Sequence, residues 1–406
     1  MLTNQKEKIV FIFSLLLVGV VYFLTQIKPQ TPYNYFILLA KQLMQGKIYL
    51  DTNPSWLNEL IPAASGKWYV VYPPMPAIIA VPFIKFGIES QTLISLVFGV
   101  LNFIILYWVL HRLYKWKLAL GLTLAFILGT NHWYLATEGS AWYISHITAI
   151  TFILIAFLLL KIRQKNDQLI TTNKMTLWFL SGLTIGAAYW SRLPDILILP
   201  FFIFLTLNKT KQIKLKNIFL WQKLALLLIG VVIFVTLNFI YNYLRFNTFS
   251  DVGYTKIPGV LQERWYTSGI FSLSYLPRNI RFILTKFPPS FSQFPFAKPS
   301  LEGMAIWLTS PFLLLTLFVN WRKKWVLALI FSGIAMIIPG FLHGTVGFSQ
   351  FGYRFALEGS LCFLISLGTI KNKKILQILL PILIILSIGI NFWGIYFIRY
   401  LHIWSL

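Results

Sequence analysis

The sequence is poor in cysteine and in charged residues of either sign. Its 406 residues include one cysteine, Cys362, which excludes a disulfide framework and a thiolate metal cluster. Charged residues make up 11% of the chain and hydrophobic residues 57%, and the mean hydropathy of +0.72 excludes a soluble enzyme of this length. Glycine-rich phosphate loops, Asp-x-Asp pairs and the His-Glu-x-x-His motif are absent too. The common signatures of soluble enzymes therefore do not apply.

Long apolar runs make up most of the chain. The first, residues 9–27, follows Lys6 and Lys8, is too long for the core of a signal peptide and has no small-residue cleavage pattern after it, so we expect an uncleaved span. With the later runs, the ~20-residue rule predicts about eleven transmembrane helices. These runs lie at 91–110, 118–135, 141–160, 177–190, 196–207, 224–241, 303–319, 325–342, 352–370 and 375–398.

The predicted fold is all-α, a polytopic integral membrane protein with a single domain over residues 1–406. Two of the runs, on either side of residues 191–195, are short and fit a re-entrant hairpin equally well. Residues 76–87 are too short and too rich in proline to cross a membrane alone, so we expect them to lead into the second span.

The net charge of +24 in a soluble protein would indicate a nucleic-acid partner, but in a membrane protein basic loops set orientation. If the N-terminus is cytoplasmic, most basic residues fall in alternate loops, near 6–8, 112–117, 161–174, 209–223, 322–324 and 371–374. Of the 11 acidic residues, only Glu7 and Asp167 share that side. We therefore predict a cytoplasmic N-terminus, a prokaryotic plasma membrane and no nucleic-acid partner.

Two outer segments, residues 28–75 and 242–302, are too long to be simple connectors, and loops of this kind often carry function. Both stay aromatic and apolar, so neither is a separate soluble domain. In the first, polar residues recur at helical spacing over residues 31–46, and in the second Pro277 begins a piece with Arg278 and Arg281 one turn apart. Each predicts a helix lying in the membrane interface.

The informative outer feature is a stretch of basic residues at 264–298 that contains no acid. It includes Arg278 and Arg281, and with Arg192, Arg245 and Arg354 it can line a cavity for a phosphate, because guanidinium groups match phosphate oxygens. Contact with lipid headgroups explains the same residues equally well.

Two carboxylates of the first outer loop, Asp51 and Glu59, face this basic surface. Either can act as the base that takes a proton from an acceptor hydroxyl while a phosphate leaves onto arginine or lysine. Both also have structural interpretations, since Asp51 can form an Asx-turn near Pro54 and Glu59 can pair with Lys67. Glu59 is preferred because a rigid aromatic and proline-rich strip, residues 66–76, follows it.

The rings of that strip, including Tyr72, can stack on a sugar or anchor the chain at the membrane interface. Arg354 and Glu358 are four residues apart and can simply pair along a helix. His132 and Glu138 share one outer turn, where an isolated hydrogen-bonding histidine is the commoner interpretation than a metal ligand. No cofactor is indicated, and a divalent metal is left open.

In order, residues 31–46, 66–76, 191–194, 241–246 and 351–355 resemble the GT-C superfamily of membrane glycosyltransferases, in the group that includes protein-O-mannosyltransferase-like (family 39-like) and arabinosyltransferase-like enzymes. The resemblance implies a polyprenyl-phosphate-linked sugar donor and an extracytoplasmic active site with an acidic base in the first outer loop. Many such enzymes carry an aspartate just after the first span, where this chain has Thr31, Pro32, Tyr33 and Asn34. The base must then be Glu59 or Asp51, or the chain is catalytically silent.

The leading hypothesis is an inverting glycosyltransferase of the cell envelope, a hexosyl- or pentosyltransferase, that uses a polyprenyl-phosphate sugar and contacts membrane lipids. Its acceptor, a glycan, a lipid or a protein, is not identified. The catalytic candidates are Glu59 and Asp51, and the substrate-binding candidates are Arg192, Arg278, Arg281, Arg354, Tyr353, Lys67, Tyr72 and Arg245. The alternatives are a transporter or flippase for a lipid-linked or anionic solute, which favours internal repeats that are not detected here, and a silent membrane scaffold.

Overall fold

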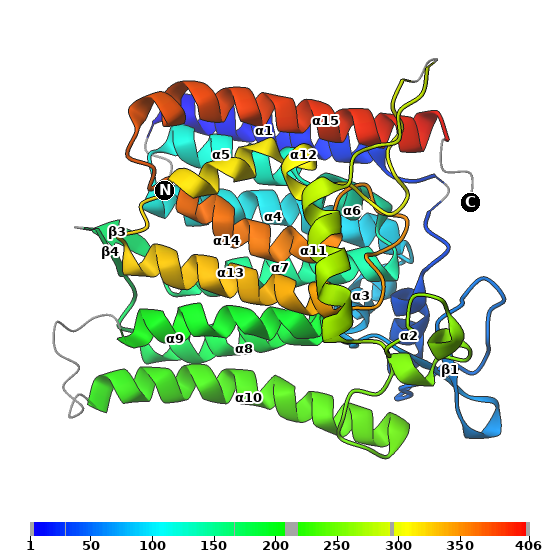
Figure 1. Ribbon diagram of the computed structural model, residues 1–406. Helices are drawn as coiled ribbons and strands as arrows, with labels where there is room; N and C mark the ends of the chain where they lie inside the picture. The colour runs from blue at the N-terminus through cyan, green and yellow to red at the C-terminus, as the bar shows by residue number, and fades with distance from the viewer. Residues whose placement is uncertain (1–3, 29, 166, 208–217, 293–295, 403–406) are drawn as a thin grey trace.

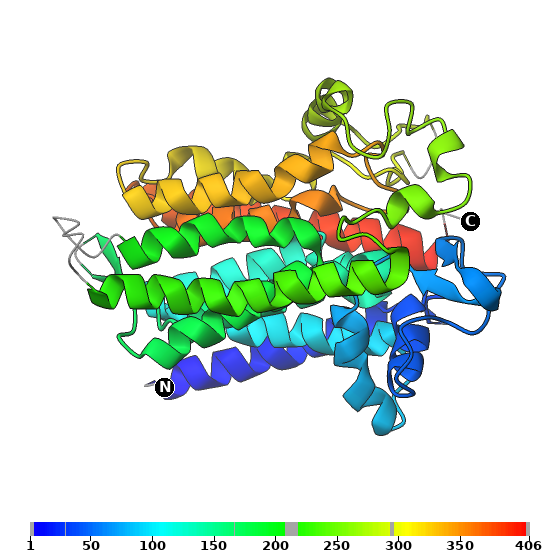
Figure 2. The same ribbon diagram turned by 90° about the horizontal axis from the view of Figure 1, so that it is seen from below.

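The structure, a computed structural model, describes the chain apart from residues 1–3, 29, 166, 208–217, 293–295 and 403–406. Its long helices run side by side along one direction, and the shorter elements of the two long loops gather at one end of this bundle (Figures 1 and 2). The lysines expected to mark a cytoplasmic loop at Lys209, Lys211, Lys214 and Lys216 lie outside the described residues.

Helices account for most of the described chain. They are α1 (Gln5–Thr25), α2 (Tyr35–Leu43), α3 (Met75–Lys85), α4 (Gln91–Leu113), α5 (Trp116–Gly129), α6 (His132–Glu138), α7 (Ala141–Leu159), α8 (Met175–Ser191), α9 (Leu199–Leu207), α10 (Ile218–Phe246), α11 (Leu276–Thr285), α12 (Ile306–Thr309), α13 (Lys324–Leu342), α14 (Leu357–Leu367) and α15 (Leu380–Tyr400). Two small hairpins pair β1 (Leu60–Pro62) with β2 (Trp68–Val70) and β3 (Arg163–Lys165) with β4 (Gln168–Ile170).

Within the described residues, six helices are long and apolar enough to cross a membrane: α1, α4, α7, α10, α13 and the helix Ile375–Tyr400 that contains α15. The pair α5 and α6, bent by 56°, makes a seventh if both belong to one span. The other predicted runs are helical but short or broken. Helix α8 has 17 residues and α14 has 11, while 3₁₀ turns interrupt 193–198 and 311–318. The helical fold is confirmed, and the count of eleven crossings stays a prediction.

Small residues let neighbouring helices approach closely. At the crossing of α8 and α10, a Cβ atom added to Gly182 would collide with the backbone of Leu227, and one added to Gly230 would collide with the backbone of Phe179. Membrane helices without a water-driven hydrophobic force associate through such close packing. This contact holds α10, which lies along the lower edge of the bundle in Figure 1, against the rest of the bundle.

The described parts of the loops predicted to be cytoplasmic include residues 163–165, 167–174 and 320–324, at the end of the bundle where Lys323 before α13 forms an ion pair of 2.7 Å with Asp167 of the β3–β4 hairpin. The backbone N–H of Asn320 donates to Thr369 at the same end. The long outer loops, with α2, β1, β2 and α11, lie toward the other end (Figures 1 and 2). The structure thus separates the two sets of loops, and which set faces the cytoplasm stays a prediction.

Helices are present at both positions where interfacial helices are expected, α2 and α11. Most of α2 is buried against α3 and the β1–β2 hairpin, and α11 runs across the direction of the long helices beside α13 (Figure 1). Their place at a membrane surface stays a prediction.

Candidate active site

Glu59 directly precedes β1, and helix α2 fixes its backbone. The β1–β2 ladder pairs Leu60 with Val70. The hydroxyl of Tyr35 in α2 accepts hydrogen bonds from the backbone N–H groups of Asn58 (3.2 Å) and Glu59 (3.0 Å), and it donates to Oδ1 of Asn58. Because one buried hydroxyl holds two consecutive peptide groups, the turn that carries Glu59 is tied to a helix rather than left free in a loop.

The carboxylate of Glu59 is oriented by Trp142, in the first turn of α7. The indole Nε1 donates to Oε2 of Glu59 over 3.0 Å, and the ring of Tyr33 lies 4.7 Å from the Trp142 ring. Burial raises the pKa of Glu59 to about 7, although the hydrogen bond from Trp142 and the charge of Arg354 lower it and Glu263 raises it. A carboxylate that titrates near neutral pH suits a general base.

Arg354 is the cation that acts on Glu59. It lies in the turn before α14 with 8% of its surface exposed, donates from Nη1 to the carbonyl of Phe348 over 2.9 Å, and places its guanidinium 4.8 Å from the ring centre of Phe355. Its Nε has no hydrogen-bond partner among the described residues. A buried guanidinium with an unused N–H is a ready contact for an anion.

Two tyrosines of the second long loop are subject to both of these charges. Burial raises the pKa of Tyr254 and of Tyr266, and for both the negative charge of Glu59 raises it further while the positive charge of Arg354 lowers it. Glu59 and Arg354 therefore both influence the two tyrosine hydroxyls.

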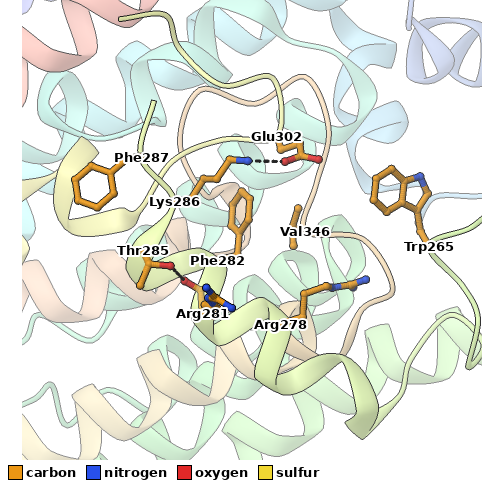
Figure 3. Close-up of a pocket in the computed structure, with 9 residues that line it drawn as sticks. All are labelled: Trp265, Arg278, Arg281, Phe282, Thr285, Lys286, Phe287, Glu302 and Val346. Atoms are coloured by element: carbon orange, nitrogen blue, oxygen red, sulfur yellow. Dashed lines mark hydrogen bonds and ion pairs between the residues drawn. The ribbon is translucent and has the colours of Figure 1, made fainter. Parts of the chain in front are cut away.

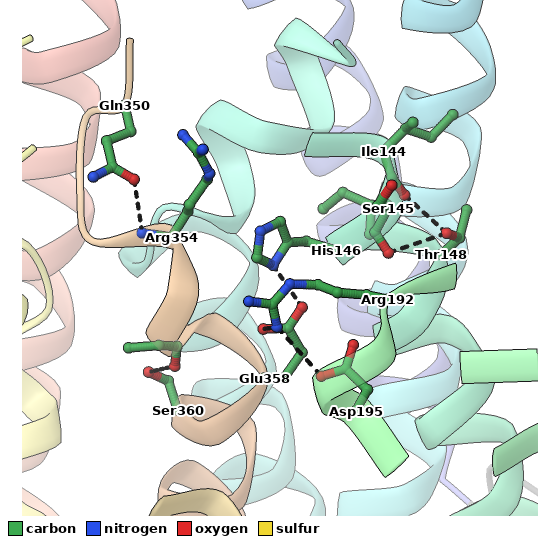
Figure 4. A network of polar contacts seen from close by, with 12 residues as sticks. Ile144, Ser145, His146, Thr148, Arg192, Asp195, Gln350, Arg354, Glu358 and Ser360 are labelled. Atoms are coloured by element: carbon green, nitrogen blue, oxygen red, sulfur yellow. Dashed lines mark hydrogen bonds and ion pairs between the residues drawn. The ribbon is translucent and has the colours of Figure 1, made fainter. Parts of the chain in front are cut away.

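Arg192 lies in a buried charged network with Glu358 (Figure 4). Its Nη1 is 3.3 Å from Oε2 of Glu358 and 3.5 Å from Oδ1 of Asp195, while Nδ1 of His146 is 2.6 Å from the other oxygen of Glu358. Figure 4 shows Arg354 directed away from Glu358. The interpretation that Arg354 and Glu358 pair along a helix is therefore wrong, because Arg192 and His146 occupy the carboxylate instead.

Arg278 and Arg281 line a separate cavity of about 300 Å³ beside α11 (Figure 3). Arg278 donates to the carbonyl of Gly344 and to Oδ1 of Asn279. Lys286 at the same cavity pairs with Glu302 over 2.9 Å. The cavity lining contains neither Glu59 nor Arg354, so the structure divides the predicted basic surface into two parts.

His343, directly after α13, links the two parts and was not anticipated from the sequence. Burial lowers its pKa to about 4, and the charges of Arg354, Arg192 and Arg278 lower it further. Its ring lies 5.7 Å from that of Tyr266. The positive charges of three of the predicted arginines thus influence one histidine whose position in the sequence follows no motif. Trp142 and His146 were missed for the same reason.

The remaining candidates have structural partners. Asp51 forms an exposed ion pair of 2.7 Å with Lys47, which lowers its pKa, in place of the expected Asx-turn. Lys67 lies over the ring of Tyr49 at 4.4 Å, so the proposed pairing of Lys67 with Glu59 is wrong. Arg245 donates to Asn242 and to the carbonyls of Val70 and Tyr241, and thereby fastens β2 to α10.

Two buried tyrosines keep an unused hydroxyl. The hydroxyls of Tyr72 and Tyr353 have no partner among the described residues, and the ring of Tyr72 lies 6.3 Å from that of Tyr254. His132, once a possible metal ligand, bonds Tyr22 and Asn102 instead. Over the described part of the chain, no cluster of three or more His, Cys, Asp or Glu side chains could hold a metal ion.

Comparison with known proteins identifies the fold. No family model matches the sequence, and no curated protein sequence matches it. Among solved structures, ArnT from Cupriavidus metallidurans bound to undecaprenyl phosphate is similar, with a TM-score of 0.51, 16% identity and coverage of 89% of this chain and 59% of that one. The oligosaccharyltransferase AglB from Archaeoglobus fulgidus, in complex with an inhibitory peptide and a dolichol-phosphate, has a TM-score of 0.51, 14% identity and coverage of 97% and 55%.

The chain therefore has the GT-C fold, and the resemblance read from the sequence is confirmed at that level. It spans little more than half the length of either structure, 59% and 55%.

Proposed function

We propose that the protein is an inverting glycosyltransferase that moves a sugar from a polyprenyl-phosphate donor to an acceptor at the extracytoplasmic face of a prokaryotic plasma membrane. The observation that carries the proposal is Glu59, a carboxylate that Trp142 orients by a hydrogen bond and whose pKa of about 7 is influenced by the charge of Arg354. The donor class is supported by the two similar structures, which were solved with undecaprenyl phosphate and dolichol-phosphate.

In the proposed reaction, the acceptor hydroxyl attacks the anomeric carbon of the sugar. Glu59 takes the hydroxyl proton as the new carbon–oxygen bond forms, and the bond between that carbon and the phosphate oxygen breaks. The polyprenyl phosphate leaves with the bonding electron pair, and the free Nε–H of Arg354 donates to its developing charge. Attack opposite the leaving phosphate inverts the configuration.

The rings around Glu59 and Arg354 supply a surface for the sugar. Tyr72, Tyr254 and Tyr266 are aromatic and lie in this region, and the hydroxyl of Tyr72 is unpaired in the described structure. Aromatic faces stack against sugar rings while hydroxyls bond their substituents. The positive charges of Arg192, Arg278 and Arg354 all act on His343.

The test is transfer from a panel of polyprenyl-phosphate hexoses and pentoses by the protein in proteoliposomes, read by product mass. Glu59→Gln keeps the shape of the side chain but removes the base, so we expect a loss of about 10²- to 10⁴-fold. Glu89→Gln is the matched control, because Glu89 is an exposed carboxylate paired with Lys41. Equal rates for wild-type protein and Glu59→Gln would contradict the assignment.

One observation favours the alternative, a transporter or flippase. The buried network of Arg192, Glu358, His146 and Asp195 is the kind of intramembrane charge that marks solute pathways. Its members largely satisfy one another, which favours a structural role. Movement of a fluorescent polyprenyl-phosphate lipid across proteoliposomes, lost in Arg192→Gln and retained in Glu59→Gln, would support the alternative instead.

A further inference from the structure

The cavity beside α11 has the residues of an anion site, separate from Glu59. Figure 3 shows Arg278, Arg281 and Lys286 from α11 and the segment that follows it, with Trp265 and Val346 on the opposite side. Its volume of about 300 Å³ is at the lower end of the range for small-molecule sites. It is therefore large enough for a headgroup and too small to enclose a long lipid chain.

The three cations of the cavity differ in how far the protein already uses them. Glu302 neutralises Lys286, and Arg278 is held by the carbonyl of Gly344. For Arg281, which is exposed, no ion pair or side-chain hydrogen bond is formed with the part of the chain that the structure describes. The cavity thus keeps an excess of positive charge, and the guanidinium group of Arg281 is available to bind an anion.

The same helix also exposes large apolar side chains. Ile280 and Leu284 of α11 are 37% and 52% exposed, and Phe287, which lines the cavity, is 57% exposed. Cations beside exposed apolar side chains on one short helix are typical of a membrane interface. A ligand that fits this arrangement has an anionic head for the cavity and an apolar tail that stays in the lipid.

The cavity also adjoins the candidate active site. Val346 lines the cavity, and two residues later the carbonyl of Phe348 accepts the hydrogen bond from Arg354. A molecule anchored at Arg281 is therefore held next to the wall that carries Arg354, at a position that the leaving phosphate does not occupy.

We propose that this cavity binds the phosphate of the acceptor, and that the acceptor is a phosphorylated membrane lipid. The inference rests on the proposed function, since it assigns the second substrate of the same site. It divides the basic surface by role, with Arg354 for the donor phosphate and Arg281 for the acceptor phosphate.

Binding is tested first, without transfer. The full chain in phosphatidylcholine nanodiscs is titrated with short-chain phosphatidic acid, which carries a phosphomonoester. We expect Arg281→Gln to weaken binding about tenfold, the effect of losing one charge-assisted hydrogen bond. Arg322→Gln, a change at an exposed arginine before α13 at the opposite end, should leave it unchanged. Equal loss in both variants, or displacement of the lipid by inorganic phosphate at similar concentration, would overturn the proposal.

Transfer is tested next, with a prokaryotic lipid extract as acceptor before and after phosphatase treatment. We expect dephosphorylation to lower the product at least tenfold, and Arg281→Gln to raise KM for the untreated extract with kcat retained. Equal transfer to both extracts would overturn this inference alone. Phosphatidic acid binding through Arg281 with no transfer to either extract would overturn the proposed function, and the assignment of an acceptor with it.

Discussion

The molecule contains two charged clusters built around one carboxylate each, Glu358 and Glu59, and these two carboxylates differ in how completely they are paired. In the cluster of Glu358, both carboxylate oxygens are engaged, one by Arg192 and one by His146, and the side chain is 0% exposed. In the cluster of Glu59, one oxygen receives the hydrogen bond from Trp142, and Arg354 keeps its Nε unpaired within the described structure.

The difference separates a structural role from a functional one. Glu358, which has a partner on each of its two oxygens, holds α7, the turn after α8 and α14 together. A buried charge with an unused donor or acceptor is costly unless a ligand completes it. The Glu358 cluster should therefore govern stability, and the Glu59 cluster should govern transfer.

After the loss expected for Glu59→Gln, the largest expected effect is at Arg354. Arg354→Gln removes the charge that faces the leaving phosphate, and loss of such a donor costs about 10²- to 10³-fold in kcat. The transfer assay with the preferred donor measures it. Arg354→Lys keeps the positive charge but not the planar guanidinium group that can donate two parallel hydrogen bonds, so we expect an intermediate rate. Wild-type activity in Arg354→Gln would show that Arg354 has no role in transfer, and the functional distinction between the Glu59 cluster and the Glu358 cluster would no longer hold.

Next in size is the effect of Glu358→Gln on stability. The change removes the nearer of the two carboxylates that pair with the largely buried Arg192, and breaking a buried pair costs about 3 kcal/mol or more. Denaturant unfolding in detergent micelles measures the loss, with Glu89→Gln as the control at an exposed pair. An unchanged free energy of unfolding in Glu358→Gln would show that the Glu358 cluster does not stabilise the fold.

A smaller effect concerns pH. Glu59 must be ionised to act as a base, and because its pKa is raised to about 7, transfer should increase as the pH rises through about 7. Trp142→Phe removes a hydrogen bond that lowers this pKa, so the rise should move up by about half a pH unit to one unit. Trp56→Phe is the control, because Trp56 is exposed and lies in the loop that carries Glu59. A shift to lower pH in Trp142→Phe would be incompatible with Glu59 as the base.

The smallest effect is expected at Asp51. Its exposed pair with Lys47 is screened by water, so Asp51→Asn should change neither transfer nor the melting temperature measurably. Both are read on the preparation used for Glu59→Gln. If Asp51→Asn alone abolished transfer, the role of base would pass to Asp51.

Much of the fold could be predicted from the sequence, because apolar length and the distribution of charge are local properties. Helices form at all the predicted runs. Hydropathy could not show where a helix breaks: 3₁₀ turns begin beside Pro194 and at Pro311, because proline removes a backbone donor.

The partners of the site could not be predicted. Trp142 is 83 residues from Glu59, and His146 is 212 residues from Glu358. Such pairs depend on which helix ends meet, and no spacing within one segment encodes them. The pairings suggested from the sequence were Glu59 with Lys67 and Arg354 with Glu358. Both join residues that are close in the sequence, because the sequence does not show which helix ends meet.

The hydroxyl of Tyr35 couples the position of Glu59 to that of helix α2. It accepts hydrogen bonds from the backbone N–H groups of Asn58 and Glu59. Because Tyr35 belongs to α2, any tilt or sliding of α2 moves the carboxylate of Glu59 with it. The height of the base above the bundle is then set by α2. Lipids that shift this helix would change the rate of transfer without touching a substrate.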